Sequence, residues 1–160
     1  MKELTDILSL LAKHDVDFVV VGGYAVAAYG SSLVTQDVDI CCDFSPENLM
    51  RLQEALSGSH PVHRMTPKRM PLVLTPENCR GLKNLYLDTD IGQVDCLGSV
   101  LGVGDFETVR QHSLSVEIDD FRCRLIDLDA LIGAKKAMGR PRDMQAVQEL
   151  EAIKEKIEND

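Results

Sequence analysis

Aromatic residues and long apolar runs are scarce in this sequence. Only 4% of its 160 residues are aromatic, and tryptophan is absent. No apolar run approaches the roughly 20 residues that a helix needs to cross a bilayer. The stretch 1–15 is instead amphipathic and carries Glu3 and Asp6, which is untypical of a secretory signal peptide. We therefore expect a cytoplasmic protein with no membrane-spanning segment.

Cysteines occur in an odd number and without the Cys-x-x-Cys spacing of a zinc ribbon. The five are Cys41, Cys42, Cys79, Cys96 and Cys123. Such a set predicts neither a disulfide framework nor a zinc site. We expect reduced thiols that behave as small buried hydrophobic residues.

Positive charge is also in short supply. The chain has 17 lysines and arginines against 26 aspartates and glutamates, which gives a formal net charge of −9. This charge repels a phosphate backbone at long range, so small-molecule or protein substrates are favoured over nucleic acid. Carboxylates that hold a cation are an exception, because the bound ion neutralises them.

Enough apolar residues are present for one compact unit. Of the 160 residues, 44% are hydrophobic, and a chain of this length can bury a core without disulfides. We expect residues 1–160 to form a single domain.

The first sixty residues alternate between helix and strand patterns. Apolar residues at helical spacing between positions 4 and 11 precede the apolar run 18–21, which ends at a glycine pair. Residues 24–29 favour a short helix through their alanines, and residues 38–42 continue a second strand. Ser45 and Pro46 supply the cap and the first position of a helix that Gly58 ends.

The remaining residues predict an irregular segment, two hairpins and a helical end. Residues 60–83 lose periodicity and gather prolines, as loops that carry substrate contacts often do. Residues 85–97 and 114–126 predict hairpins, and residues 128–138 and 144–157 predict helices. The predicted fold class is α/β (α+β), a mixed β-sheet flanked by helices with a helical carboxy-terminal end.

Three aspartates on predicted strands are candidate metal ligands. Asp37 and Asp39 are two residues apart on one strand, so both carboxylates project from the same face. Asp95 lies in a later, otherwise apolar strand, where an aspartate needs a partner to offset its desolvation. Magnesium prefers a few such carboxylates together with substrate phosphates. The alternatives are a solvated strand edge for the first pair and a hydrogen bond to a neighbouring loop for Asp95. The apolar residues around the pair look like core, which argues against a solvated edge, and they are Val34, Val38 and Ile40.

A glycine pair separates the first strand from the short helix. Because Gly22 and Gly23 have no side chains, a triphosphate can approach the backbone N–H groups and the positive end of the helix. Taken alone, the pair favours a tight turn between a strand and a helix over a phosphate site.

The combination of these features is more specific than any one of them. Gly22-Gly23, a short helix, Asp37-Val38-Asp39 and the distant Asp95 together resemble the DNA polymerase beta-type nucleotidyltransferase superfamily. The stretch Leu128–Asp143 resembles the carboxy-terminal part of small bacterial stand-alone members, including those linked to toxin and antitoxin systems. Many members have a serine after the first glycine, where this chain has Gly23.

The resemblance implies a role for each matching residue. Asp37, Asp39 and Asp95 would be catalytic and would hold magnesium, with two ions expected, while Gly22, Gly23 and Lys135 would bind the nucleotide. The implied enzyme is a nucleotidyltransferase that uses a nucleoside triphosphate such as ATP. It moves the nucleoside monophosphate to an unidentified acceptor hydroxyl, on a small molecule or a protein rather than a nucleic acid, and releases pyrophosphate.

A different function on the same fold stays open. The chain could be a catalytically weak nucleotide-binding module, or one partner of a toxin and antitoxin pair. Assembly with a second copy or with a partner protein is open as well.

Other polar residues have weaker claims to a role. Arg140 and Arg142 neutralise triphosphate charge or lie on a solvated helix face, and Asp143 fits a helix cap or an ion pair. His60 and His63 lie beside a proline without nearby cysteines, which argues against a metal site. The basic residues of the 60–83 segment could guide a phosphorylated acceptor or be solvated, and they are Arg64, Lys68, Arg69, Arg80 and Lys83.

Overall fold

The protein was analysed as a computed structural model that describes residues 2–159. The helices are α1 (Lys2–Lys13), α2 (Gly22–Ala28), α3 (Pro46–Leu56), the short 3-10 helix η1 (Ser57–Ser59), α4 (Phe106–Gln111), α5 (Leu128–Met138) and α6 (Pro141–Asn159). The strands are β1 (Phe18–Val21), β2 (Asp37–Cys42), β3 (Val62–His63), β4 (Asn84–Thr89), β5 (Gly92–Leu97), β6 (Ser99–Val100), β7 (Gly104–Asp105), β8 (Ser113–Ile118) and β9 (Phe121–Ile126). No helix among the described residues is long and apolar enough to span a membrane.

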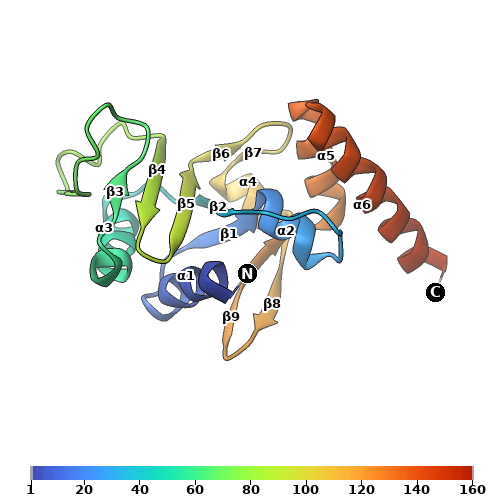
Figure 1. The fold of residues 1–160 in the computed structure, drawn as a ribbon, viewed down its shortest axis with the longest axis horizontal. Helices are drawn as coiled ribbons and strands as arrows, with labels where there is room; N and C mark the ends of the chain where they lie inside the picture. Colours follow the sequence, from blue (N-terminus) through green and yellow to red (C-terminus); the bar gives the residue numbers. More distant parts are fainter. Residues whose placement is uncertain (1, 160) are drawn as a thin grey trace.

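A seven-stranded mixed sheet organises the chain in the order β3-β4-β5-β2-β1-β9-β8. The central strand β2 pairs antiparallel with β1 and parallel with β5. Helices α1 and α3 pack against each other, while α5 and α6 lie side by side at the opposite side of the molecule from β3 (Figure 1). The predicted mixed sheet with flanking helices and a helical carboxy-terminal end is confirmed.

Local sequence signals fixed most element boundaries. Ser45 caps α3 by accepting a hydrogen bond from the Asn48 N–H, and Pro46 occupies the first helical turn, as predicted. Gly139 ends α5 in the left-handed conformation that favours glycine, with φ +69°. The five cysteines are all free and buried, which confirms their expected packing role.

Three details differ from the sequence predictions. The glycine pair is the first turn of α2 itself rather than a turn that precedes the helix. Helix α4 and the small hairpin β6–β7 were not predicted, because each is too short to show a periodic apolar pattern. Val34 was expected in the core and is 91% exposed, since it lies in the irregular segment before β2.

Candidate functional site

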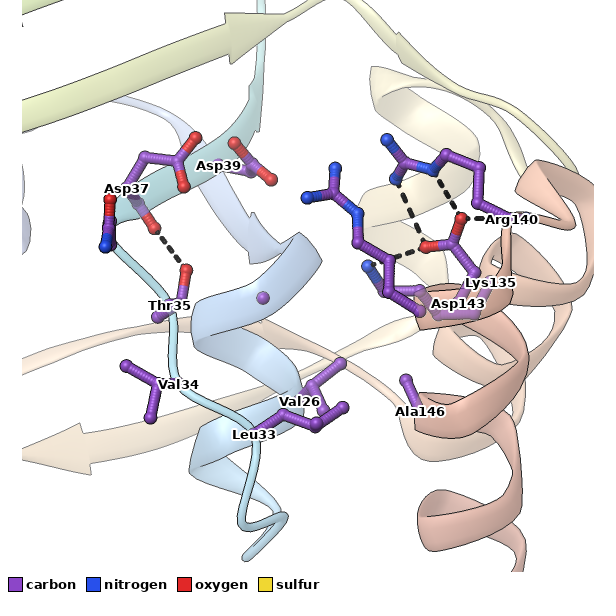
Figure 2. A pocket seen from close by; sticks show the side chains of 13 residues that line it. Val26, Leu33, Val34, Thr35, Asp37, Asp39, Lys135, Arg140, Asp143 and Ala146 are labelled. Carbon is purple, nitrogen blue, oxygen red and sulfur yellow. Dashed lines mark hydrogen bonds and ion pairs between the residues drawn. The ribbon is translucent and has the colours of Figure 1, made fainter.

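The β2 strand carries Asp37 and Asp39 on one face. Their neighbours Val38 and Ile40 are fully buried, whereas both aspartates are only half-buried. This alternation is the period-two pattern of a strand with one apolar face, and it directs both carboxylates to the opposite side. Figure 2 shows the two side chains at the edge of a cavity, across from the corner between α5 and α6.

The third aspartate joins them through strand register. Strand β5 runs parallel to β2, with Asp95 directly opposite Asp39 and Gln93 opposite Asp37. Asp37, Asp39 and Asp95 each place a carboxylate oxygen within 4.8 Å of the other two. Within residues 2–159, no other group of three or more histidines, cysteines or acids meets this geometry. His60 instead pairs with Asp90 through its Nδ1, 2.6 Å from the carboxylate.

Two of these carboxyl groups, Asp39 and Asp95, have raised pKa values, mainly because they are partly buried. Burial, followed by the nearby charges of Asp37 and Asp95, raises the pKa of Asp39 to about 6, although Lys135 and Arg64 oppose the change. Burial also raises the pKa of Asp95, and the Arg64 guanidinium beside it lowers that pKa in part. The cluster therefore favours a positive partner.

The donor set fits a hard divalent cation such as magnesium. Its three carboxylates offer oxygen ligands from two adjacent strands, and they leave most of the coordination sphere to water and substrate. A bound cation would offset both the burial of the Asp39 charge and its repulsion by Asp37 and Asp95, which together raise the pKa of Asp39.

The raised pKa of Asp39 predicts that the stability of the metal-free protein depends on pH. The pKa of Asp39 is higher in the folded chain than the unfolded value of 3.8, so its contribution to stability is fully present below about pH 4. That contribution is lost as the pH rises through about 6. We expect metal-free Asp39→Asn to match the parent near pH 4 and to exceed its free energy of unfolding by about 3 kcal/mol at pH 7.

Denaturant unfolding in a chelator, repeated between pH 4 and pH 7, measures this difference. Asp120→Asn is the control, because Lys13 lowers the pKa of that carboxyl below 3.8, so its contribution to stability should be nearly constant between pH 4 and pH 7 and be lost only at lower pH. A constant difference between Asp39→Asn and the parent across this range would contradict the raised pKa of Asp39.

Gly22 and Gly23 each lie against a different neighbouring side chain. Gly22 has φ +64°, and a Cβ added to it would meet Asp39 Oδ2 at 2.2 Å. A Cβ added to Gly23 would meet Thr35 Oγ1 at 2.7 Å. Thr35, which sequence reasoning missed, donates a hydrogen bond from this hydroxyl to the Asp37 carbonyl oxygen at 3.0 Å. The Thr35 hydroxyl thus occupies the space that a side chain at position 23 would need.

A serine at Gly23 must therefore displace Thr35. We expect Gly23→Ser to lower the free energy of unfolding by about 1 kcal/mol, because it overpacks a tight contact. Thr35→Ala in the same chain should recover most of this loss, since it removes the hydroxyl that the new Cβ approaches. Denaturant unfolding of both single variants and the double variant gives the coupling energy. Additive effects of the two substitutions would contradict the contact.

A cavity of about 410 Å³ adjoins Asp37 and Asp39. Figure 2 shows its walls: the segment through Val34 and Thr35 lies on one side, and Lys135 and Arg140 lie on the other. Its charged lining is balanced, with three carboxylates and three cations, namely Asp37, Asp39, Asp143, Lys135, Arg140 and Arg142. A divalent cation on the two β2 aspartates would leave this cavity with an excess of positive charge.

The buried carboxylate of Asp143 fixes the cationic wall. Asp143 is 1% exposed and accepts hydrogen bonds from the Arg140 N–H at 3.2 Å and from Arg140 Nε. Lys135 Nζ lies 3.5 Å from the same carboxylate. These contacts confirm Asp143 as a cap and ion-pair partner, at the third residue of α6, from which an acid reaches back to the helix start. Lys136 points elsewhere and pairs with Glu151 at 2.9 Å.

A second cavity, of about 240 Å³, opens on the same residues. Asp39, Lys135 and Arg140 line both cavities. The rest of the second lining is mainly apolar and includes Leu97, Val100, Leu101, Leu131 and Met138. Asp39, Lys135 and Arg140 can therefore be reached both from the polar cavity and from the apolar cavity.

Arg64 reaches the carboxylates from the irregular segment, which sequence reasoning did not foresee. Its Nη2 lies 2.7 Å from Asp95 Oδ1, at ion-pair distance but without the angles of a hydrogen bond. Asp95 therefore has a partner in the irregular segment and also belongs to the carboxylate cluster, so the two alternatives for this residue do not exclude each other. No sequence signal distinguished Arg64 from the other basic residues of the segment.

Comparison with known proteins identifies the fold. No protein-family model matches the sequence, and no curated protein matches it either. The solved structure of the lincosamide antibiotic adenylyltransferase LnuA with lincomycin bound is similar, with a TM-score of 0.64 and 17% identity, over 95% of this chain and 96% of that one.

Two further structures are similar at lower scores. A nucleotidyltransferase-like antigenic protein from Paracoccidioides brasiliensis gives a TM-score of 0.57 and 15% identity, over 95% of this chain and 75% of that one. The structure of ANT(2")-Ia in complex with adenylyl-2"-tobramycin gives a TM-score of 0.55 and 12% identity, over 99% of this chain and 98% of that one. The chain therefore has the nucleotidyltransferase fold, as its resemblance to the DNA polymerase beta-type superfamily implied.

Proposed function

We propose that the chain is a metal-dependent nucleotidyltransferase that transfers a nucleoside monophosphate to a hydroxyl of a small molecule. The observation that carries the proposal is the meeting of Asp37, Asp39 and Asp95 within 4.8 Å, beside a cavity lined by three cations. The fold adds support, because LnuA and ANT(2")-Ia are solved with an antibiotic and an adenylylated antibiotic. The acidic net charge of −9 disfavours a nucleic-acid acceptor.

The polar cavity is the proposed site of the triphosphate. Lys135, Arg140 and Arg142 face the β2 aspartates across it and can neutralise phosphate oxygens. Gly23 also lines this cavity and leaves room for a phosphate near the backbone, and Gly22 lets Asp39 lie close to the start of α2. The apolar cavity on the other side of Asp39 has room for a nonpolar part of a substrate.

The proposed reaction is an in-line displacement at the α-phosphorus. The acceptor oxygen forms a bond to this phosphorus, the bond from the phosphorus to the bridging oxygen breaks, and pyrophosphate leaves. Magnesium held by Asp37 and Asp39 would supply charge stabilisation for the leaving group. Asp95 lies on the side of the irregular segment. We assign Asp95 to the side where the acceptor binds, where it would take up the proton of the acceptor hydroxyl.

A direct assay tests this function. The protein is incubated with magnesium, each labelled nucleoside triphosphate and a panel of hydroxylated small molecules that includes aminoglycosides and lincosamides. We expect pyrophosphate release together with a nucleotide-sized mass increase on one acceptor, and the loss of both in Asp39→Asn.

One observation favours a second candidate function, a nucleotide-binding module with little turnover. Arg64 already neutralises Asp95 at 2.7 Å, which leaves a smaller negative charge for an acceptor-side cation. Nucleotide binding that depends on magnesium, without pyrophosphate release for any acceptor, would favour this module over the transferase. The reduced state of the five cysteines suits a cytoplasmic location for either function.

A further inference from the structure

Three strands place Arg64, Tyr86 and Asp95 in one row. Arg64 follows β3, and its N–H donates to the Tyr86 carbonyl oxygen at 2.9 Å. Tyr86 on β4 is directly opposite Asp95 on β5, and Asp95 is directly opposite Asp39 on β2. Residues opposite each other on adjacent strands share a face, so this row leads from the irregular segment to the carboxylate cluster.

The Arg64 side chain is held along this row. Its guanidinium carbon lies 5.9 Å from the centre of the Tyr86 ring, and its Nη1 donates to the Leu87 carbonyl oxygen at 3.3 Å. Only 17% of the Arg64 side chain and 14% of the Asp95 side chain are exposed. The ion pair is therefore sheltered from water, unlike the more exposed pair that Arg69, from the same segment, forms with Asp88 on β4.

The other two carboxylates have no such partner. Asp95 has a basic side chain within 4.0 Å, whereas no basic side chain among residues 2–159 lies within 4.0 Å of the Asp37 or Asp39 carboxylate oxygens. A first divalent cation can therefore bind the β2 aspartates without breaking an ion pair. A second cation that uses Asp95 must compete with the Arg64 guanidinium for this carboxylate, because an arginine stays charged at any physiological pH.

We infer that Arg64 and a second divalent cation compete for Asp95, so that the chain binds one cation tightly and a second only when Arg64 leaves. This inference rests on the proposed function, in which Asp37 and Asp39 hold the first ion. Arg64 is then a positioning residue that supplies positive charge to Asp95 until the second cation or the substrate takes its place. The irregular segment thereby controls how many ions the site holds.

Manganese binding tests the competition directly, since Mn²⁺ takes the same oxygen ligands and is detected by electron paramagnetic resonance. We expect the parent to bind one Mn²⁺ and, more weakly, a second. In Arg64→Gln the second dissociation constant should fall about tenfold or more, and a magnetically coupled pair should appear at lower Mn²⁺. Arg64→Lys keeps the charge and should stay near the parent.

Arg69→Gln is the matched control, because Arg69 belongs to the same segment and pairs with Asp88 outside the cluster. It should leave both dissociation constants unchanged. An unchanged second dissociation constant in Arg64→Gln would overturn the competition. The failure of the proposed function is a separate result: Asp39→Asn would then bind the first Mn²⁺ as tightly as the parent.

A measurement on the parent protein keeps the inference testable if Arg64→Gln does not fold. The Arg64 side-chain N–H signals, assigned by comparison with Arg64→Lys, are followed by nuclear magnetic resonance during titration with Mg²⁺. We expect these signals to persist at the first equivalent and to shift only as the second ion binds. Signals that stay unchanged at saturation, or that shift fully with the first ion, would contradict the inference.

Discussion

Asp39→Asn should lower transfer by at least about a thousandfold while it stabilises the metal-free protein at neutral pH. The rate effect corresponds to about 4 kcal/mol of lost transition-state stabilisation, because the amide keeps the shape but cannot supply the charge that holds a cation. The stability effect has the opposite sign, since burial and Asp37 and Asp95 already disfavour the ionised form of Asp39. Asp37→Asn should lose transfer in the same way.

Pyrophosphate release under saturating magnesium measures the rate, and thermal melting in a chelator measures stability. Asp120→Asn, which removes an exposed partner of Lys13, should keep its rate within about twofold. Together the two measurements distinguish a variant that has lost a metal ligand, which stays folded, from a variant that has lost activity because it unfolds. An Asp39→Asn protein with its metal-dependent rate intact would remove Asp39 from the site.

Gly22→Ala should destabilise the protein by about 3 kcal/mol or more. Two effects combine here: φ is +64°, which disfavours any residue with a Cβ, and the new Cβ would lie 2.2 Å from Asp39 Oδ2. The Asp39 side chain would have to move, so the carboxylate cluster should be lost along with stability. Denaturant unfolding and magnesium binding measure the two losses.

Gly81→Ala separates the two effects. Gly81 has φ +81° with no atom within 4 Å of an added Cβ, so its substitution should cost only about 1 kcal/mol of backbone strain. Adding Asp39→Gly to Gly22→Ala removes the clashing atoms and should recover part of the stability but none of the transfer. Equal losses in Gly22→Ala and Gly81→Ala would mean that the approach to Asp39 is unimportant.

Elements with strong local signals were predictable from the sequence. Strand β1 and helix α5 begin and end where the apolar pattern places them, and Ser45 caps α3 as its position indicates. Alternation along β2 was enough to place Asp37 and Asp39 on one face. The hairpin predicted over residues 85–97 is formed by β4 and β5, with Thr89 opposite Gly92 beside its turn.

Contacts between distant segments were not predictable in this way. Arg64 reaches Asp95 because β3 pairs with β4 in a particular register, and a two-residue strand has no pattern of its own. The closeness of Thr35 to Gly23 likewise depends on how the exposed segment before β2 returns over α2. Both contacts follow from tertiary packing rather than from the spacing of residue types.

The parallel pairing of β2 with β5 joins strands that are far apart along the chain. The β4–β5 hairpin can form early from local contacts, whereas docking of β5 on β2 closes a long loop and is slow. We therefore expect Asp95 to meet Asp39 late in folding, after the transition state. A cation that binds the completed cluster should accordingly slow unfolding more than it speeds folding, so the ion prolongs the lifetime of the native state rather than guiding the chain to it.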